Sequence, residues 1–231
     1  MDEVIALDGR DDVRQSGLKA MEVAVMAATS AAMIAATALG AWSIGWTEVI
    51  GFVTGGVCVW LIVRENMWNW PIGLANNIVF FVLFTQARLF ADAGLQIVYL
   101  FLGIYGWWHW LRGGEQRSEL KVTHAPVREL LLLAAAVPVA TWGVREVLVL
   151  ANGSAPFLDA LTTVISLAAQ ILTCRKRIES WPVWITVDII YIPLYLSRGL
   201  PLIAVLYGVF LIMCLAGWRQ WRASYLSGLR T

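Results

Sequence analysis

Trp70-Pro71 and Gly106-Trp107-x-x-Trp110 mark the two ends of a stretch that this chain contains twice. The same residues return as Trp181-Pro182 and Gly217-Trp218-x-x-Trp221, and the offset is identical, since 181 − 70 = 217 − 106 = 111. Tryptophan is a rare residue, so three tryptophan pairs at one ungapped offset indicate an internal repeat rather than chance. Internal repetition sets the architecture of a chain and is therefore interpreted before any single motif.

The composition predicts a membrane protein. The chain is 59% hydrophobic and only 14% charged, with a mean hydropathy of +0.70, whereas soluble domains carry about a quarter charged residues. Its apolar runs are long enough to cross a bilayer core of about 30 Å as helices. They are continuous and do not alternate, which argues against a β-barrel. We predict eight transmembrane helices, at about 20–41, 47–63, 70–87, 92–111, 127–150, 156–174, 182–197 and 200–218.

Basic residues predict the orientation of these helices. With eight spans, Lys and Arg accumulate on one face, and only Arg88 and Arg198 fall on the other. Because Lys and Arg concentrate on the cytoplasmic side of membrane proteins, both termini are expected in the cytoplasm. Without the first span, the basic residues that precede it would lie on the face that otherwise has few basic residues. The charge bias therefore favours eight spans over seven.

The number of spans in each repeat predicts how the repeats are arranged. Each repeat contains three spans, and the helix at 127–150 has no counterpart, so it returns the chain to the face from which the first repeat began. The fold class is thus an all-α membrane protein with two parallel three-helix repeats, a linker helix between them and one extra N-terminal helix. The expected parts are an N-terminal tail and helix (1–44), a first bundle (45–111), a link with the linker helix (112–155), and a second bundle with its tail (156–231).

Polar side chains inside the spans are the candidates for function, because they are costly in a membrane and usually face an interior cavity. Asn76 and Asn77 fall near the middle of the third span, and Asp188 near the middle of the seventh. Asn77 and Asp188 are repeat partners, since 188 − 77 = 111. A carboxylate at mid-membrane costs at least about 2.5 kcal/mol on insertion scales, which favours a cavity role for Asp188. Asn77 could instead serve an interhelical hydrogen bond.

Further polar and aromatic residues share helix faces with these groups. The pairs 77/80, 188/191, 96/99 and 207/210 are each spaced by three, so each pair lies on one face. Together they predict a central cavity with an acidic group, amides and aromatic walls. Trp70 and Trp184 could line it too, or could belong to the interfacial belt, and Gln170 is a weaker candidate. The predicted substrate-binding residues are Trp70, Asn76, Asn77, Phe80, Gln96, Tyr99, Trp184, Asp188, Tyr191 and Tyr207.

The sequence does not predict an enzyme. It lacks a Ser/His/Asp set, a cluster of metal-binding carboxylates, a pair of histidines at metal spacing and a glycine-rich phosphate loop. Its three cysteines have no metal-binding spacing either. We therefore expect no catalytic residue, no metal, no cofactor and no nucleic-acid partner. A scaffolding subunit is the other non-enzymatic alternative, but it would leave the repeated polar faces unexplained.

One motif is specific enough to indicate a family. Trp68-Asn69-Trp70-Pro71-Ile72-Gly73 resembles the WNWPxG signature of the PnuC-type nicotinamide riboside transporters. The stretches 91–96 and 105–110 resemble that family's next helix, and 184–195 resembles its counterpart in the second repeat. The similarity covers about 45–222.

The resemblance implies uptake of nicotinamide riboside, an NAD precursor, across a bacterial inner membrane. It implies a fold similar to that of the SWEET sugar transporters and a homotrimer in the lipid bilayer. It also implies facilitated diffusion, in which a cytoplasmic kinase traps the riboside by phosphorylation. Relatives of the family carry thiamine, riboflavin or deoxynucleosides, and thiamine is likewise an aromatic cation. A transporter of a related vitamin or nucleoside, such as thiamine, is therefore the alternative, and the intact WNWPIG favours the riboside.

Overall fold

The computed structural model describes residues 46–86, 90–150, 156–197 and 201–229, and part of the stretch 28–39. The predicted first span lies mostly outside these residues. The chain divides into two compact units, Met1–Gly56 and Val57–Thr231. The described helices are α2 (Trp46–Val63), α3 (Asn69–Gln86), α4 (Phe90–Arg112), the 3-10 helix η1 (Glu115–Arg117), α5 (Val127–Leu150), α6 (Pro156–Cys174), α7 (Ser180–Ser197) and α8 (Pro201–Gly228).

The prediction of an all-helical membrane protein is confirmed, and within the described residues seven α-helices follow seven of the predicted apolar runs. Three described helical stretches are long and apolar enough to cross a membrane, namely Val127–Leu150, Pro156–Cys174 and Ala204–Gly228. A shorter apolar stretch covers Val49–Val63. The last helix differs from its prediction, because α8 continues to Gly228, beyond the apolar run that ends near residue 218. The residues that follow, 219–228, mix charged, polar and apolar side chains that are compatible with a helix, so hydropathy alone ended it too early.

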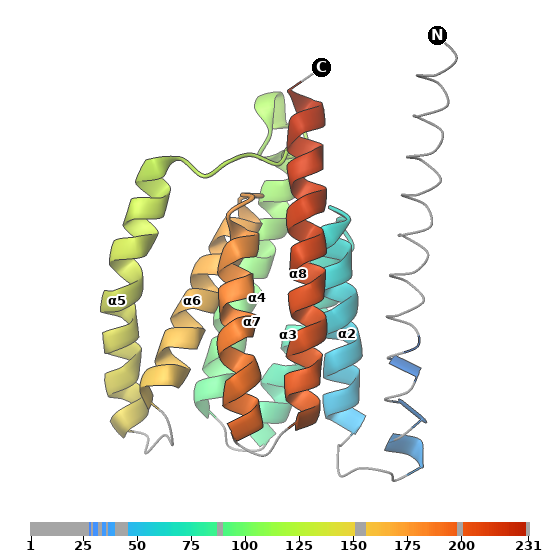
Figure 1. The fold of residues 1–231 in the computed structure, drawn as a ribbon, viewed down its shortest axis with the longest axis vertical. Helices are drawn as coiled ribbons and strands as arrows, with labels where there is room; N and C mark the ends of the chain where they lie inside the picture. The colour runs from blue at the N-terminus through green and yellow to red at the C-terminus, as the bar shows by residue number, and fades with distance from the viewer. Residues whose placement is uncertain are drawn as a thin grey trace. The chain divides into compact units, whose positions relative to one another are not determined.

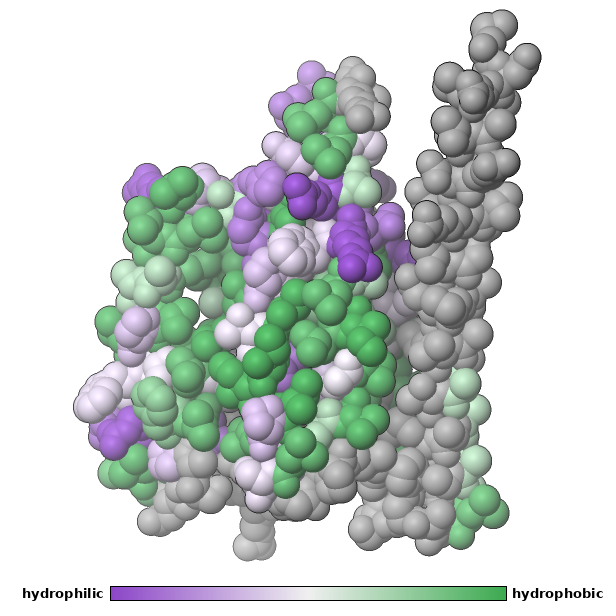
Figure 2. Space-filling view, in the orientation of Figure 1, coloured by the Kyte–Doolittle hydropathy of each residue, from purple (hydrophilic) through white to green (hydrophobic). Residues whose placement is uncertain are grey.

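The second unit is built from pairs of neighbouring helices. α3 packs against α4 and α7 against α8, while α6 contacts α4, α5 and α7. α5 stands at the edge beside α6 (Figure 1). Its outer residues are apolar and exposed, among them Val127, Leu131, Val139 and Leu150. Figure 2 shows apolar side chains over most of this face and polar ones gathered where the link between α4 and α5 lies.

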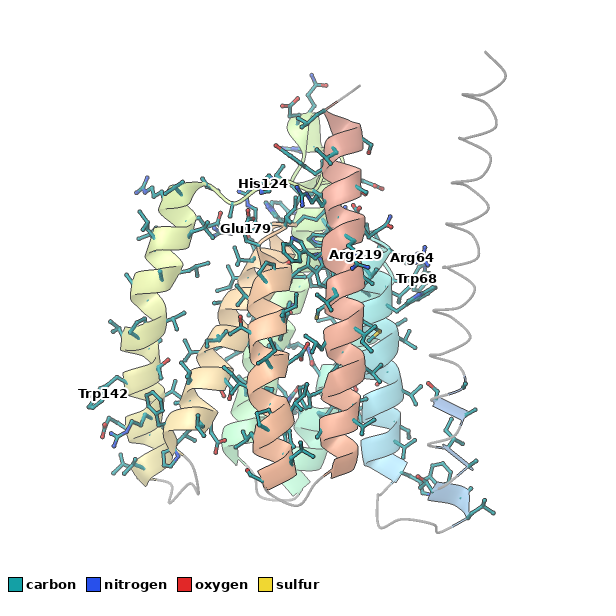
Figure 3. The ribbon with its side chains drawn as sticks, in the orientation of Figure 1. Arg64, Trp68, His124, Trp142, Glu179 and Arg219 are labelled. Carbon is teal, nitrogen blue, oxygen red and sulfur yellow. The ribbon has the colours of Figure 1, made fainter. Side chains whose placement is uncertain are left out.

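The link, residues 113–126, identifies one end of the second unit, which we call the link end. Arg64, Arg219, His124 and Glu179 all lie at this end, whereas Trp142 on α5 lies toward the other (Figure 3). The clustering of these basic side chains fits the one-sided distribution of charge that the sequence predicts.

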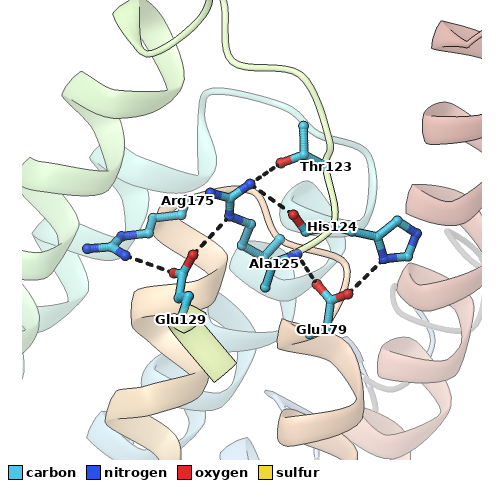
Figure 4. Close-up of polar contacts among 7 residues, drawn as sticks. Thr123, His124, Ala125, Glu129, Arg175 and Glu179 are labelled. Atoms are coloured by element: carbon cyan, nitrogen blue, oxygen red, sulfur yellow. Dashed lines mark hydrogen bonds and ion pairs between the residues drawn. The ribbon is translucent and has the colours of Figure 1, made fainter. Parts of the chain in front are cut away.

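Ion pairs and hydrogen bonds fasten the link to the turn between α6 and α7 (Figure 4). Glu129 at the start of α5 accepts a hydrogen bond from Arg175 at 2.8 Å and lies 3.4 Å from Nε of Arg177. Glu179 accepts the backbone N–H of Ala125 at 2.8 Å and pairs with Nδ1 of His124 at 2.7 Å. The link is therefore held on the second repeat.

Two turns at the link end have the same backbone. Glu65, after α2, and Lys176, after α6, both have positive φ, at 54° and 53°, and they are repeat partners, since 176 − 65 = 111. In each turn the amide of this residue bonds to the carbonyl three residues before it, and the next amide bonds five residues back, all at 2.9 Å. This is the Schellman ending of a helix, which usually takes glycine. The two side chains pair with each other, Nζ to Oε2, at 2.8 Å.

Four tryptophans form the centre of the link end, and we call them the tryptophan cluster. Trp70 and Trp110 meet edge to face with centroids 5.3 Å apart, and Trp181 and Trp221 repeat that arrangement at 5.2 Å. Trp110 and Trp221 join the two pairs at 5.8 Å. All four side chains are buried, so the two repeats share one apolar core here.

Crossed hydrogen bonds connect the repeats at this cluster. Trp110, in the first repeat, donates its Nε1–H to the carbonyl of Thr173 in the second, at 3.0 Å. Trp221, in the second repeat, donates to the carbonyl of Ile62 in the first, also at 3.0 Å. The donors and the acceptors are both repeat partners, since 221 − 110 = 173 − 62 = 111. Each repeat thus completes the hydrogen bonding of the other.

Glycines make room for the outer tryptophans of the cluster. A Cβ atom on Gly106 would overlap the indole ring of Trp70, and one on Gly217 would overlap that of Trp181. The Gly-Trp-x-x-Trp motif therefore has a packing role: its glycine accommodates one tryptophan of the cluster, and its last tryptophan supplies another.

Candidate functional site

A cavity of about 360 Å³ lies within the second unit. That volume is in the range of small-molecule sites, about 300–1,000 Å³. The cavity is bounded by the end of α2 and by α3, α4, α6, α7 and α8. Its lining residues are Cys58, Val59, Ile62, Asn69, Trp70, Gly73, Leu74, Asn76, Asn77, Tyr99, Gly103, Ser166, Gln170, Trp181, Trp184, Val187, Asp188, Tyr191, Tyr207, Phe210 and Cys214.

Most of the predicted substrate-binding residues line this cavity. The structure brings together Trp70, Asn76, Asn77, Tyr99, Trp184, Asp188, Tyr191 and Tyr207. Phe80 and Gln96 do not line it, although their repeat partners Tyr191 and Tyr207 do. The predicted faces therefore converge, but the second repeat supplies more of the aromatic wall than the first.

Asp188 is the charged centre of the cavity. It is 4% exposed, and its Oδ2 lies 3.5 Å from Sγ of Cys214, which donates a weak hydrogen bond to it. Among the lining residues described, it is the single carboxyl group, and none of them is basic. A buried charge is costly unless a partner compensates it. The cavity is therefore suited to a ligand that carries a positive charge.

Aromatic rings form a wall close to this carboxyl group. Tyr191 and Tyr207 lie 4.7 Å apart between centroids, and Tyr195 stacks on Tyr207 at 5.3 Å with its plane tilted by only 16°. Phe210 meets Tyr207 edge to face at 5.8 Å. The faces of such rings attract cations, so this wall and Asp188 favour the same kind of ligand.

Indole N–H groups add hydrogen-bond donors to the lining. Trp184 donates its Nε1–H to Oγ1 of Thr173 at 3.1 Å, which fixes its ring in the wall. Trp70 and Trp181, which are repeat partners, are 3% and 2% exposed, and their buried Nε1 atoms have no hydrogen-bond partner among the described residues. Buried donors normally have a partner, so these two are available to a ligand or to water.

Several lining residues were not predicted. Trp181 could have been found from the repeat, because its partner Trp70 was a candidate. Phe210 belonged to a predicted cavity face through its spacing from Tyr207, although it was not among the predicted substrate-binding residues. Ser166 lies one helical turn before the weaker candidate Gln170 on α6, and both line the cavity. Cys58 and Cys214 gave no signal, since a cysteine in an apolar run is indistinguishable from a small core residue.

Comparisons with known proteins agree on a membrane transporter and differ in the substrate named. Residues 45–223 match the nicotinamide mononucleotide transporter family. The chain is 27% identical over 209 residues to the nicotinamide riboside transporter PnuC of Escherichia coli (strain K12), covering 79% of this chain and 87% of that protein. It is 29% identical over 181 residues to the riboflavin/roseoflavin transporter RibM of Streptomyces davaonensis, covering 76% and 84%.

A solved structure extends the similarity to the fold. The crystal structure of the vitamin B3 transporter PnuC superposes with a TM-score of 0.67 at 26% sequence identity, covering 88% of this chain and 91% of that one. Relatives and fold therefore indicate a membrane transporter, and the expectation that the chain is not an enzyme is confirmed.

Proposed function

Because this chain belongs to the nicotinamide mononucleotide transporter family, we propose that it is a membrane transporter whose substrate is nicotinamide riboside. The observation that carries the proposal is the buried Asp188 beside a wall of aromatic rings. Nicotinamide riboside contains a pyridinium cation. Aromatic faces attract such a cation by roughly 0.5–2 kcal/mol, and the carboxylate of Asp188 offsets its charge.

The rest of the lining suits the polar parts of the same molecule. Its ribose hydroxyls and carboxamide need both donors and acceptors, and amide side chains such as Asn77 and Gln170 supply both. The Nε1–H groups of Trp70 and Trp181 supply two more donors at positions related by the repeat. We propose that all ten predicted residues act in recognition, with Phe80 and Gln96 contributing when the cavity changes shape.

A phosphorylated ligand fits this cavity poorly. The phosphate of nicotinamide mononucleotide would meet no basic side chain among the described lining residues, and it would lie in the same small cavity as Asp188. Like charges in a buried site repel strongly. We therefore expect the riboside to bind and the mononucleotide to be rejected, although the family bears the mononucleotide's name.

Riboflavin is the second candidate, because one relative is a riboflavin transporter at 29% identity. Its isoalloxazine ring is neutral, so it would leave Asp188 without a compensating charge. Thiamine remains a further alternative, since its thiazolium ring is an aromatic cation like the pyridinium. Asp188 favours both cations over riboflavin but does not separate them.

We also propose how the fold transports the substrate. Eight spans with both termini in the cytoplasm would place the link end on the cytoplasmic side, where the tryptophan cluster closes the cavity. Movement of the two three-helix bundles about α5 would open the cavity to each face in turn. Transport would be facilitated diffusion in a bacterial inner membrane, with phosphorylation trapping the riboside and feeding NAD synthesis. The exposed apolar face of α5 would be available for assembly into a homotrimer.

Isothermal titration calorimetry on the detergent-purified protein tests the substrate. Nicotinamide riboside, thiamine, riboflavin and nicotinamide mononucleotide would be titrated separately. We expect micromolar or tighter binding of the riboside and none of the mononucleotide. Binding of thiamine or riboflavin alone would keep the cavity and change the substrate. No binding by any of the four would overturn the proposal.

A further inference from the structure

Thr173 makes three hydrogen bonds, two through its hydroxyl and one through its backbone carbonyl, at the boundary between the cavity and the tryptophan cluster. It is 1% exposed, in the last turn of α6. Its hydroxyl donates to the carbonyl of Ala169 at 2.9 Å and accepts the Nε1–H of Trp184 at 3.1 Å. Its own carbonyl accepts the Nε1–H of Trp110 at 3.0 Å.

The two indoles bound to this residue belong to different parts of the molecule. Trp184 lines the cavity, whereas Trp110 is a member of the tryptophan cluster and does not line it. Because the donated bond to Ala169 orients the hydroxyl, a lone pair of Oγ1 points in a fixed direction. The position of Nε1 of Trp184 is then tied, through the Thr173 hydroxyl, to a backbone carbonyl one turn earlier in α6.

The first repeat has no equivalent of this bond. The partner of Thr173 is Ile62, whose carbonyl accepts Trp221 just as that of Thr173 accepts Trp110, but isoleucine has no hydroxyl. The partner of Trp184 is Gly73, since 184 − 111 = 73. Both repeats thus have the bond from an indole to a backbone carbonyl, whereas only the second repeat has the bond from an indole to a side-chain hydroxyl.

We propose that Thr173 is a positioning residue that orients Trp184 for substrate binding and connects it to the tryptophan cluster. A ligand that stacks on Trp184 shifts the indole, and the hydroxyl transmits this shift to the end of α6, whose carbonyl anchors Trp110. Thr173 therefore couples occupation of the cavity to opening at the link end. This inference rests on the proposed function for the identity of the ligand. The positioning of Trp184 by Thr173 does not depend on which ligand binds.

Three variants on α6 separate positioning from folding. Thr173→Val removes the hydroxyl and keeps both the shape and the carbonyl, and Thr173→Ser restores the hydroxyl. Thr162→Val is the matched control, because Thr162 is also fully buried and its hydroxyl also bonds four residues back, to Leu158 at 2.9 Å, but among the described residues its hydroxyl accepts no indole N–H.

The first readout is binding of nicotinamide riboside by calorimetry and its uptake into proteoliposomes. We expect Thr173→Val to raise Kd and KM five- to tenfold, as loss of one buried hydrogen bond implies. Thr173→Ser and Thr162→Val should stay within twofold of the wild type. An unchanged Kd for Thr173→Val, or an equal rise for Thr162→Val, would overturn the proposal.

The second readout follows the link end directly. A membrane-impermeant maleimide would be applied to the link-end face of oriented vesicles, and labelling of the cavity thiols of Cys58 and Cys214 would be timed. Saturating riboside should change the labelling rate at least threefold in the wild type and in Thr162→Val, and not in Thr173→Val. Equal ligand dependence in all three would refute the coupling.

A third readout needs no ligand, so it separates this inference from the proposed function. Thermal unfolding of Thr173→Val, Trp184→Phe and the double variant forms a double-mutant cycle. If the hydroxyl of Thr173 stabilises the protein through Trp184, its removal should cost nothing further once Trp184 is phenylalanine. Equal stability of the double variant and Trp184→Phe would therefore support the bond, even if none of the tested ligands bound. Strictly additive losses would show that Thr173 does not position Trp184.

Discussion

The link end and the cavity lie next to each other in the second unit, yet the two repeats are equivalent at the link end and different in the cavity. At the link end, partners make the same contacts: two edge-to-face tryptophan pairs, two crossed indole bonds and two turns with positive φ. In the cavity, partners have diverged, so that Asn77 in the first repeat corresponds to Asp188 in the second, and Gly73 corresponds to Trp184. The link end, where partners are equivalent, holds the two repeats together. The cavity, where partners differ, presents different side chains on its two sides, as an asymmetric ligand requires.

The largest expected effect tests the divergence of the cavity. We expect Asp188→Asn to weaken riboside binding by roughly thirtyfold, about 2 kcal/mol, because a buried cation loses its counter-charge. The protein should still assemble, since the amide keeps the shape of the carboxylate. Calorimetry and size-exclusion chromatography measure the two outcomes.

The reverse change sharpens this test. Asn77→Asp in the Asp188→Asn background moves the carboxylate to the partner position. If the two repeats were interchangeable in the cavity, the double variant would recover binding. We expect less than a threefold recovery, and full recovery would contradict the divergence.

The next effect tests the equivalence of the link end. Gly106→Ala and Gly217→Ala should each destabilise the protein by about 1–3 kcal/mol, because overpacking forces a buried indole to move. Neither ring moves freely, since each is packed against another tryptophan of the cluster. Thermal unfolding should give losses of similar size in both repeats. Gly208→Ala on α8 is the control, because its Cβ would meet nothing within 4 Å. A loss in only one repeat would refute the equivalence.

A smaller effect concerns the ion pair that joins the two turns. The side chains of Lys176 and Glu65 are 8% and 21% exposed, so the pair is partly shielded from solvent. Glu65→Gln, Lys176→Gln and the double variant should give a coupling free energy of about 1 kcal/mol in thermal unfolding. The loss for Lys176→Gln should be the larger, because Lys176 also donates to the carbonyl of Leu120 and lies 4.7 Å from the Trp110 ring centroid. Zero coupling would mean that the pair is incidental.

The smallest effect concerns a contact of the link end that the repeats do not share. Glu179 binds the link, whereas its partner Trp68 is 67% exposed. Glu179→Gln keeps the size of the side chain and should cost less than about 1 kcal/mol, as expected for a pair near the surface. Glu115→Gln, in the exposed 3-10 helix, serves as the control. A loss as large as that of Gly217→Ala would show that the link is essential for the cluster.

The sequence predicted the fold well because its strongest signals were local or repeated. Continuous apolar runs located α2 to α8, and the tryptophan motifs gave the offset of 111 that relates the contacts at the link end. The end of α8 was missed, since hydropathy reports the membrane and not the helix. The sequence also indicated Asp188 and Asn77, because polar groups in apolar runs are conspicuous.

What the sequence could not supply depends on distances between helices. Thr173 and Cys214 are ordinary residues in apolar helices, and only their neighbours across helix interfaces give them roles. Phe80 and Gln96 have the correct spacing on their helices but lie outside the cavity lining, because helical periodicity fixes the direction of a side chain and not how far the cavity extends. The offset of 111 identifies repeat partners, but it does not show which partners make the same contacts.

The crossed indole bonds also impose an order of events on the growing chain. Trp110 needs a carbonyl 63 positions later, and Trp221 bonds to one 159 positions earlier. Both bonds must therefore await synthesis of the second repeat, and the second of them awaits α8. Until then the first repeat has an indole N–H and a carbonyl without these partners. Synthesis of both repeats, rather than of either one, is the step that completes the tryptophan cluster.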